Sequence, residues 1–159
     1  MHGARCAAAR YQGAQSIAHV LGARCGPKQG EPHEFGYYPI RPTEAGKRFF
    51  PEELHVCQSH FHEFAIPDGA ERLASSVVFP NQAMRYGATT FGFQFHPEVT
   101  RAGFRRWQDR DWAAFGKPGA QTRDEQDRLG SQHDPAQHDW FMRFLDRLFG
   151  GERAMCTHS

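Results

Sequence analysis

The sequence predicts an α/β fold of three layers, in which a mostly parallel sheet lies between helices. Two patterns support this. Short strand-like runs rich in aromatic and β-branched residues, separated by turn residues, fill the middle of the chain between residues 34 and 96. Helical patterns of apolar residues flank them around residues 12–22, 99–115 and 134–150. With 159 residues, the chain is long enough for one domain with a sizeable core.

The composition excludes several classes of protein. The formal net charge is only +1, which does not indicate a nucleic-acid or membrane partner. The four cysteines have no C-x-x-C spacing, so we expect free thiols in a reducing cytoplasm. Residues 1–10 lack the apolar stretch of a signal peptide, and no apolar run approaches the length of a membrane span. We therefore expect a cytoplasmic protein.

The first half of the chain predicts one helix and two strands. Apolar residues have helical spacing within residues 12–22, and Gly22 suits the position that follows a helix end. Residues 34–40 predict an edge strand, because Pro39 cannot donate a ladder hydrogen bond. Residues 54–61 predict the next strand.

The second half predicts three further strands and two helices. The strands cover, in order, residues 73–78, 82–86 and 91–96. A helix is expected over residues 99–115, and the polar stretch 116–132 predicts a loop. Asp134 as N-cap and Pro135 as first helical residue predict the start of the last helix, which Gly150 ends.

The most informative stretch is Phe91-Gly92-Phe93-Gln94-Phe95-His96-Pro97-Glu98. Its three phenylalanines alternate with other residues, so in a strand they share one face. Pro97 cannot continue the ladder and ends the strand at His96. Glu98 then lies close enough to orient the imidazole. A histidine held by a carboxylate is the base half of a nucleophile–His–acid triad.

The His-Pro-Glu string resembles a signature of the class I glutamine amidotransferases, in particular members similar to the glutaminase domain of GMP synthase. Two further stretches match that family in the same order. Gly13-Ala14-Gln15 before an apolar helix is similar to the end of the G-x-C-x-G-x-Q nucleophile elbow. Ser59-His60-Phe61 resembles the segment whose backbone binds the α-amino and carboxylate groups of glutamine.

This resemblance implies a flavodoxin-like fold and a glutamine-hydrolysing reaction without a cofactor. His96 would act as general base and then acid, with Glu98 as its orienter. Ala14 and Gln15 would frame the substrate and its oxyanion. Glutamine is the implied partner, together with a synthetase subunit or another enzyme that accepts the ammonia. The domain would span residues 12–150, between an unmatched segment 1–11 and a loose tail 151–159.

The chain departs from the family at the nucleophile. Tyr11 stands where the cysteine belongs, and a phenol with a pKa of about 10 is a poor substitute for a thiolate. The strands that precede the elbow in the family have no counterpart, so we expect a sheet without its N-terminal strands and little activity. A catalytically inactive relative that serves as a binding or regulatory subunit is a second hypothesis.

A third hypothesis is a metal-dependent hydrolase. His60 and His62 have H-x-H spacing, which in a strand places both rings on one face, and His96 and Cys57 could complete a zinc site. The amidotransferase interpretation already uses two of these histidines, so we predict no metal. Cys57 shares a strand with the expected substrate segment and is the cysteine to test as an alternative nucleophile.

Overall fold

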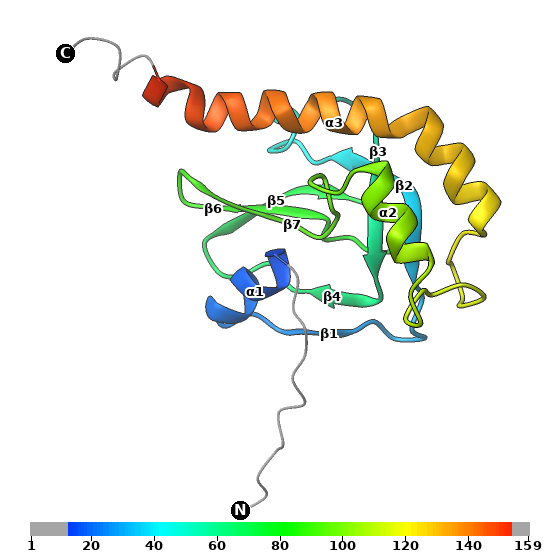
Figure 1. Ribbon diagram of the computed structural model, residues 1–159. Coiled ribbons are helices and arrows are strands. Elements are labelled where there is room, and N and C mark those ends of the chain that lie inside the picture. The colour runs from blue at the N-terminus through cyan, green and yellow to red at the C-terminus, as the bar shows by residue number, and fades with distance from the viewer. Residues whose placement is uncertain (1–12, 154–159) are drawn as a thin grey trace, which may run out of the picture.

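The computed structural model describes residues 13–153, in which helices lie on both faces of a curled sheet (Figure 1). The elements follow one another as α1 (Gly13–Val20), β1 (Cys25–Pro27), β2 (Glu34–Pro42), β3 (Leu54–His60), β4 (His62–Phe64), β5 (Ala70–Ser75), β6 (Ala83–Tyr86), β7 (Thr90–Phe93), α2 (Arg101–Gln108) and α3 (Arg123–Arg153). None of the described helices is both long and apolar enough to span a bilayer.

The strands form a five-stranded sheet in the order β3-β2-β5-β6-β7 and a separate pair of β1 with β4. Each pairing within the described residues is antiparallel, so the expected mostly parallel sheet is not confirmed. For strands that follow one another directly in a hairpin, the reason is the length of the connection. Only residues 87–89 join β6 to β7, for example, whereas a parallel pair requires a crossover of about a dozen residues or more.

The β7 strand separates two helical layers, because its side chains alternate between them. Phe93 contacts the rings of Trp140 and Phe144 in α3, with centroids 5.7 and 5.2 Å apart. Gly92 faces the other way, and a Cβ added there would lie 2.9 Å from Ala14 Cα in α1. The predicted alternation is therefore observed, and glycine at position 92 lets α1 approach the sheet closely.

The apolar core lies mainly between the sheet and α3. Its buried members come from β2, β3, β5, β6 and α3 and from the segments next to them: Ile40, Phe50, Leu54, Val56, Leu73, Ala74, Ala83, Phe95, Trp140 and Phe144. Trp140 also donates from Nε1 to the carbonyl of Phe49 at 2.8 Å, which satisfies its one polar group in this environment. The second half of α3 is thereby held against the sheet.

The expectation that β2 is an edge strand is wrong. Its residues Glu34–Ile40 pair with β3 on one side, and Arg41 and Pro42 pair with β5 on the other. Because β5 joins the strand only beyond Pro39, the missing amide of that proline does not interrupt the β5 ladder. The prediction failed because the proline rule was applied to the whole strand, although β2 has a partner on its second side only at one end.

The last helix begins twelve residues earlier than predicted. It runs from Arg123 to Arg153 and contains Pro135, so the segment 116–132 is only partly a loop. Thr122 and Glu125 form a capping box, in which Thr122 N donates to Glu125 Oε2 at 2.8 Å and Glu125 N donates to Thr122 Oγ1 at 3.3 Å. The helix bends between its two halves in Figure 1, as expected for a helix with an internal proline.

The predicted helix over residues 99–115 is shorter than expected. It covers Arg101–Gln108, with Thr100 as its N-cap and Asp109 as its C-cap. Asp134, which was expected to cap the last helix, instead accepts a hydrogen bond from the Tyr37 hydroxyl at 3.2 Å. It thus links α3 to β2.

Candidate functional site

His96 is carried to the site by a segment that changes its partner strand. Regular pairing of β7 with β6 ends at Phe93, three residues before the predicted strand end. Gln94 N still donates to Gln82 O at 2.8 Å, but His96 N donates to Cys57 O of β3, also at 2.8 Å. The backbone of His96 is therefore fixed at the outer edge of β3, at the opposite end of the strand order from β7.

His96 and Glu98 form a close pair at this edge. His96 Nδ1 lies 2.8 Å from Glu98 Oε1, and the His96 side chain is 13% exposed while that of Glu98 is 57% exposed. Partial burial alone would raise the pKa of Glu98, but the hydrogen bond to His96 and the charge on its ring lower the pKa below its ordinary value. Trp107 of α2 contacts the imidazole edge to face, with centroids 4.9 Å apart. The pair thus has the geometry of a base with its orienting carboxylate.

A cavity of about 610 Å³ opens beside this pair. Ser59, His60 and Phe61, at the end of β3, line it together with His96 and Trp107. The segment that was assigned to substrate binding therefore shares one cavity with the expected general base. A small molecule held by the β3 end could reach the imidazole.

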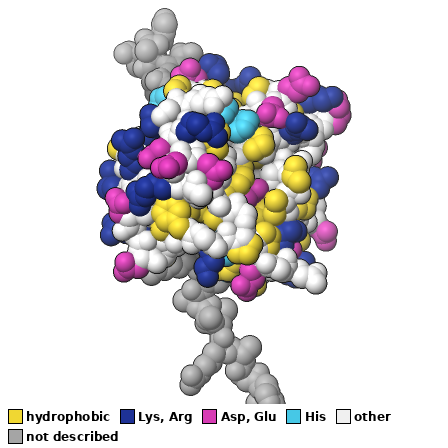
Figure 2. All heavy atoms as spheres, turned by 90° about the vertical axis from the view of Figure 1, so that its right-hand side faces the viewer, with side chains coloured by type: hydrophobic (Ala, Val, Ile, Leu, Met, Phe, Trp, Pro, Cys, Tyr) yellow, Lys and Arg dark blue, Asp and Glu magenta, His cyan; other side chains and the backbone are white. Residues whose placement is uncertain are grey.

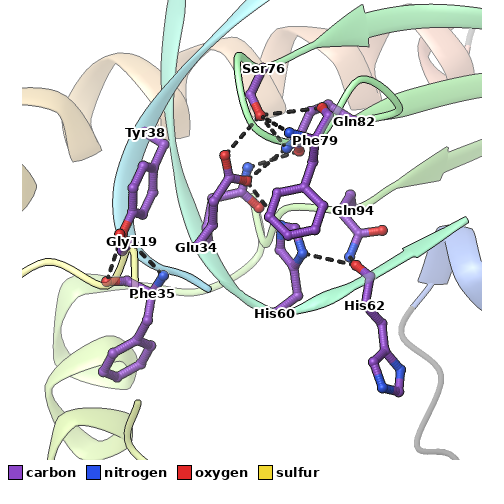
Figure 3. Close-up of polar contacts among 11 residues, drawn as sticks. Glu34, Phe35, Tyr38, His60, His62, Ser76, Phe79, Gln82, Gln94 and Gly119 are labelled. Carbon is purple, nitrogen blue, oxygen red and sulfur yellow. Dashed lines mark hydrogen bonds and ion pairs between the residues drawn. The ribbon is translucent and has the colours of Figure 1, made fainter. Parts of the chain in front are cut away.

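The ring of His60 lies within a buried polar network (Figure 3). Its Nε2 lies 3.1 Å from Glu34 Oε2, and both side chains are only 2% exposed. Glu34 also accepts hydrogen bonds from Ser76 Oγ at 2.7 Å and from Gln82 Nε2 at 2.8 Å. The buried carboxylate thus interacts with three side chains, and this network holds the end of β3 in place.

The H-x-H pattern does not place two rings on one face. The strand is interrupted at Phe61, because β3 ends at His60 and β4 begins at His62. The two rings point apart in Figure 3, and His60 Nδ1 lies 3.1 Å from the carbonyl oxygen of His62. Within the described residues, no group of three His, Cys, Asp or Glu side chains could hold a metal ion.

Cys57 is fully buried, and burial raises the pKa of its thiol well above the ordinary value. A thiol in that environment is not a thiolate near neutral pH, so Cys57 is unsuited to be the nucleophile. Its backbone instead forms two hydrogen bonds that hold the site together. The amide donates to Gln137 Oε1 of α3 at 2.6 Å, and the carbonyl accepts from His96 N.

The helix α1 approaches the site with its first turn. Gly13 and His96 line a second cavity, of about 510 Å³. Ala14 is buried under β7, and Gln15 is 2% exposed, with its carbonyl accepting from Cys25 Sγ at 3.4 Å. Tyr11, at the expected nucleophile position, lies outside the described residues.

Two contributors to the site were missed by sequence reasoning. Trp107 was not among the predicted site residues, but its ring contacts the imidazole of His96. No sequence pattern indicated a role for Gln137, because its partner Cys57 is 80 positions away along the chain. A polar residue on a helix gives no indication of which strand it will meet.

Comparison with known proteins gives a consistent family. A model described as "Glutamine amidotransferase class-I" matches residues 12–106. The glutamine amidotransferase-like protein YfeJ of Salmonella typhimurium is 39% identical over 94 residues, which are 55% of this chain and 38% of that protein. A glutamine-hydrolyzing GMP synthase subunit from Thermococcus kodakarensis is 35% identical over 91 residues, 55% of this chain and 47% of that protein. The chain thus spans about half or less of these relatives.

Solved structures agree with this result. A glutamine amidotransferase from Thermotoga maritima superimposes with a TM-score of 0.69 at 26% identity, over 85% of this chain and 58% of that chain. A second, from Methylobacillus flagellatus, has a TM-score of 0.75 at 24% identity over 87% of this chain and 59% of that chain, which supports the fold alone. Because the family model covers more than half of the sequence, the chain belongs to the class I glutamine amidotransferase family.

Proposed function

We propose that the protein binds glutamine in the cavity beside His96 and carries the acid–base half of a glutaminase site. The observation that carries this proposal is the 2.8 Å contact between His96 Nδ1 and Glu98 Oε1, in a cavity that Ser59 and Phe61 also line. Glu98 fixes the ring, and His96 moves the proton. The backbone of the β3 end takes part in holding the substrate.

In this reaction a thiolate attacks the side-chain amide carbon of glutamine, and the oxygen develops negative charge. His96, protonated after accepting the thiol proton, donates it to the leaving ammonia, and a glutamyl thioester remains. Water then attacks the thioester with His96 as base, which releases glutamate and restores the thiol. We assign Ala14 and Gln15, near the start of α1, to framing the substrate and its oxyanion.

The nucleophile decides how much of this reaction the chain performs. Tyr11 occupies the position that corresponds to the cysteine, and a phenol is largely protonated near neutral pH. We infer that the chain binds glutamine but hydrolyses it poorly. Loss of a nucleophile costs on the order of a millionfold in rate in serine proteases.

Several relatives are named as glutamine-hydrolyzing GMP synthase, some of them as a single subunit of that enzyme. By analogy we propose a synthetase or another ammonia-accepting enzyme as partner, in the cytoplasm. The second candidate function is a binding or regulatory subunit without turnover, which Tyr11 favours. Both candidates use the same cavity, so they differ only in the chemical step.

The deciding experiment measures glutamine binding and ammonia release separately. The original chain, Tyr11→Cys, and each of these fused to the N-terminal part of the Salmonella relative would be compared, with and without a chelator. We expect binding by all proteins and substantial ammonia release only by the fused Tyr11→Cys protein, abolished by His96→Ala. Rapid turnover by the original chain would contradict the proposal, and turnover that the chelator abolishes would favour the metal hydrolase.

A further inference from the structure

A cavity of about 600 Å³ lies between α3 and the segment 43–53, which joins β2 to β3 and lies next to α3 in Figure 1. None of the residues that line it also lines the cavity beside His96. Its charged lining residues are all exposed, and the basic ones outnumber the acidic ones: Lys47, Arg48, Arg143 and Arg147 against Glu53 and Asp139. The cavity therefore has an excess of positive charge.

Ion pairs with residues outside the cavity do not remove this excess. Glu53 pairs with Arg41, whose Nη2 lies 2.9 Å from Glu53 Oε2. Lys47 pairs with Glu44 of the same segment. The lining charges that form no ion pair within residues 13–153 are three arginines and one aspartate: Arg48, Arg143, Arg147 and Asp139. Two positive charges thus remain in excess.

Contacts between the two walls of the cavity hold these arginines near one another. Trp140 Nε1 of α3 donates to Phe49 O at 2.8 Å. Arg147 Nη1 donates to Arg48 O, so the guanidinium of Arg147 reaches across to the segment 43–53. The ring of Phe50 stacks on Trp140 with centroids 4.8 Å apart, and both side chains are buried. Aromatic packing and backbone contacts therefore keep the like charges together.

The charges around α2 are arranged differently. Arg123 pairs with Asp109 at 2.9 Å, and Arg105 of α2 pairs with Asp127 at 3.7 Å. Figure 2, which views the side of the molecule where α2 lies, shows basic and acidic side chains next to one another. The whole chain has a formal net charge of only +1. The excess of arginine in the cavity is therefore a local feature.

We propose that this cavity binds a diphosphate group, either as the free anion or as part of a nucleotide. Arginine side chains donate paired hydrogen bonds to phosphate oxygens. Arg143 and Arg147 are four residues apart on α3 and therefore lie on one face of it, while Arg48 belongs to the opposite wall. Cations on two walls suit an anion with more than one charged group.

This site is independent of the proposed glutamine site. The volume of about 600 Å³ is within the range of small-molecule sites. The arginines of α3 lie beyond residues 12–106, outside the segment that matches the family model. An anion bound here would also relieve the repulsion between the arginines, so its binding should stabilise the folded state.

The first test is isothermal titration calorimetry of the full chain with inorganic diphosphate. We expect saturable binding of one anion per chain with a Kd below about 1 mM. Arg143→Gln should weaken it on the order of tenfold, because it removes a charge-assisted hydrogen bond. Arg48→Gln removes a charge from the other wall and should act in the same direction. Arg128→Gln removes an exposed charge from α3 outside the cavity and should leave the affinity unchanged.

The second test locates the bound anion through the indole N–H signals of the three tryptophans in proton–nitrogen NMR spectra. Trp140 lines the proposed cavity, whereas Trp107 and Trp112 line a cavity with Arg106 and Arg110 of their own. Inorganic diphosphate should shift the signal of Trp140, which Trp107→Phe and Trp112→Phe identify by elimination. Shifts confined to Trp107 and Trp112 would place the anion beside α2 and overturn the proposal.

Thermal unfolding separates binding from a structural role of Arg143. Inorganic diphosphate should raise the Tm of the original chain and of Arg128→Gln, and raise that of Arg143→Gln much less. Equal affinities of these three proteins, or no saturable binding by the original chain, would overturn the proposal. Adenosine diphosphate, compared with inorganic diphosphate, distinguishes the two sources. Tighter binding of the nucleotide supports a nucleotide ligand, and equal or weaker binding supports the free anion.

Discussion

The Glu98 carboxyl depends on His96 for its low pKa. Partial burial acts to raise its pKa, and the hydrogen bond and charge of His96 outweigh that effect. In a His96→Phe variant only the hydrogen bond from the backbone of Glu98 itself would still oppose the burial effect, so we expect the pKa of Glu98 to rise above its value in the original chain. Carbon-13 NMR titration of the side-chain carboxyl measures this directly.

Glu125 provides the control for that titration. Its pKa is lowered by hydrogen bonds from the backbone and hydroxyl of Thr122, which His96 does not touch. The pKa of Glu125 should therefore be the same in both proteins. An unchanged pKa of Glu98 in His96→Phe would show that the two side chains do not interact in solution.

Gln137 supports the site from α3 through a single buried contact. Its Oε1 accepts from Cys57 N at 2.6 Å, and Cys57 O accepts from His96 N. Gln137→Met has a similar length but no acceptor, so it leaves a buried amide unpaired. We expect a loss of about 1–3 kcal/mol in unfolding free energy, measured by urea denaturation. The same change at exposed Gln132 should have little effect, and equal losses at both positions would contradict this role.

The difference between His96 and Gln137 explains how much of the site could be predicted. His96 and Glu98 are two positions apart, so their spacing and the geometry of the intervening proline already imply a contact. The contact of Gln137 with β3 joins residues 80 positions apart and depends on how α3 lies over the sheet. Local patterns contain no information on that packing, and the same limit applies to Trp107.

At the scale of elements, the sequence contains a second start signal for α3, upstream of the predicted one. Thr122 and Glu125 have the T-x-x-E spacing of a capping box, and their reciprocal hydrogen bonds are formed. The Asp134-Pro135 pair was a competing start signal of the same kind. Pro135 is instead tolerated inside the helix, where the bend visible in Figure 1 accommodates it.

Removal of this cap tests which start is used. Thr122→Ala eliminates the side-chain acceptor at the N-terminus of α3, and we expect a loss of about 0.5–2 kcal/mol in unfolding free energy. Thr122→Ser keeps the hydroxyl and should retain most of the stability. If α3 began at Asp134, both variants would be as stable as the original chain in thermal or urea denaturation.

At the scale of the whole molecule, the strand positions were largely predictable and their directions were not. Alternation and turn residues locate β2, β3, β6 and β7, because these patterns are local. Strand direction depends on which strands become neighbours, and the expected parallel order came from the general architecture of the fold. The short connections, such as residues 87–89, were the local evidence for antiparallel hairpins.

The contact between α3 and β3 has a titratable component. His55 of β3 and His133 of α3 stack with centroids 3.8 Å apart and an angle of 6° between the rings. Burial lowers the pKa of both, and the charge of His55 further lowers that of His133. The charge of Glu53 acts to raise the pKa of both histidines, and the charge of Arg128 acts to lower the pKa of His133. The folded state therefore binds protons less readily at this pair than the unfolded chain does.

This difference predicts that acid weakens the fold. Above the unfolded pKa of about 6.5 both histidines are neutral in either state, and the pair contributes its full stability. As the pH falls below that value, the unfolded chain takes up protons first, and stability declines until the folded-state pKa is passed. Urea denaturation between about pH 7.5 and 5.5 should show a falling unfolding free energy. In His133→Phe, which keeps an aromatic ring on His55 without a titrating group, the fall should be shallower. An equal fall in both proteins would assign the acid sensitivity to other groups.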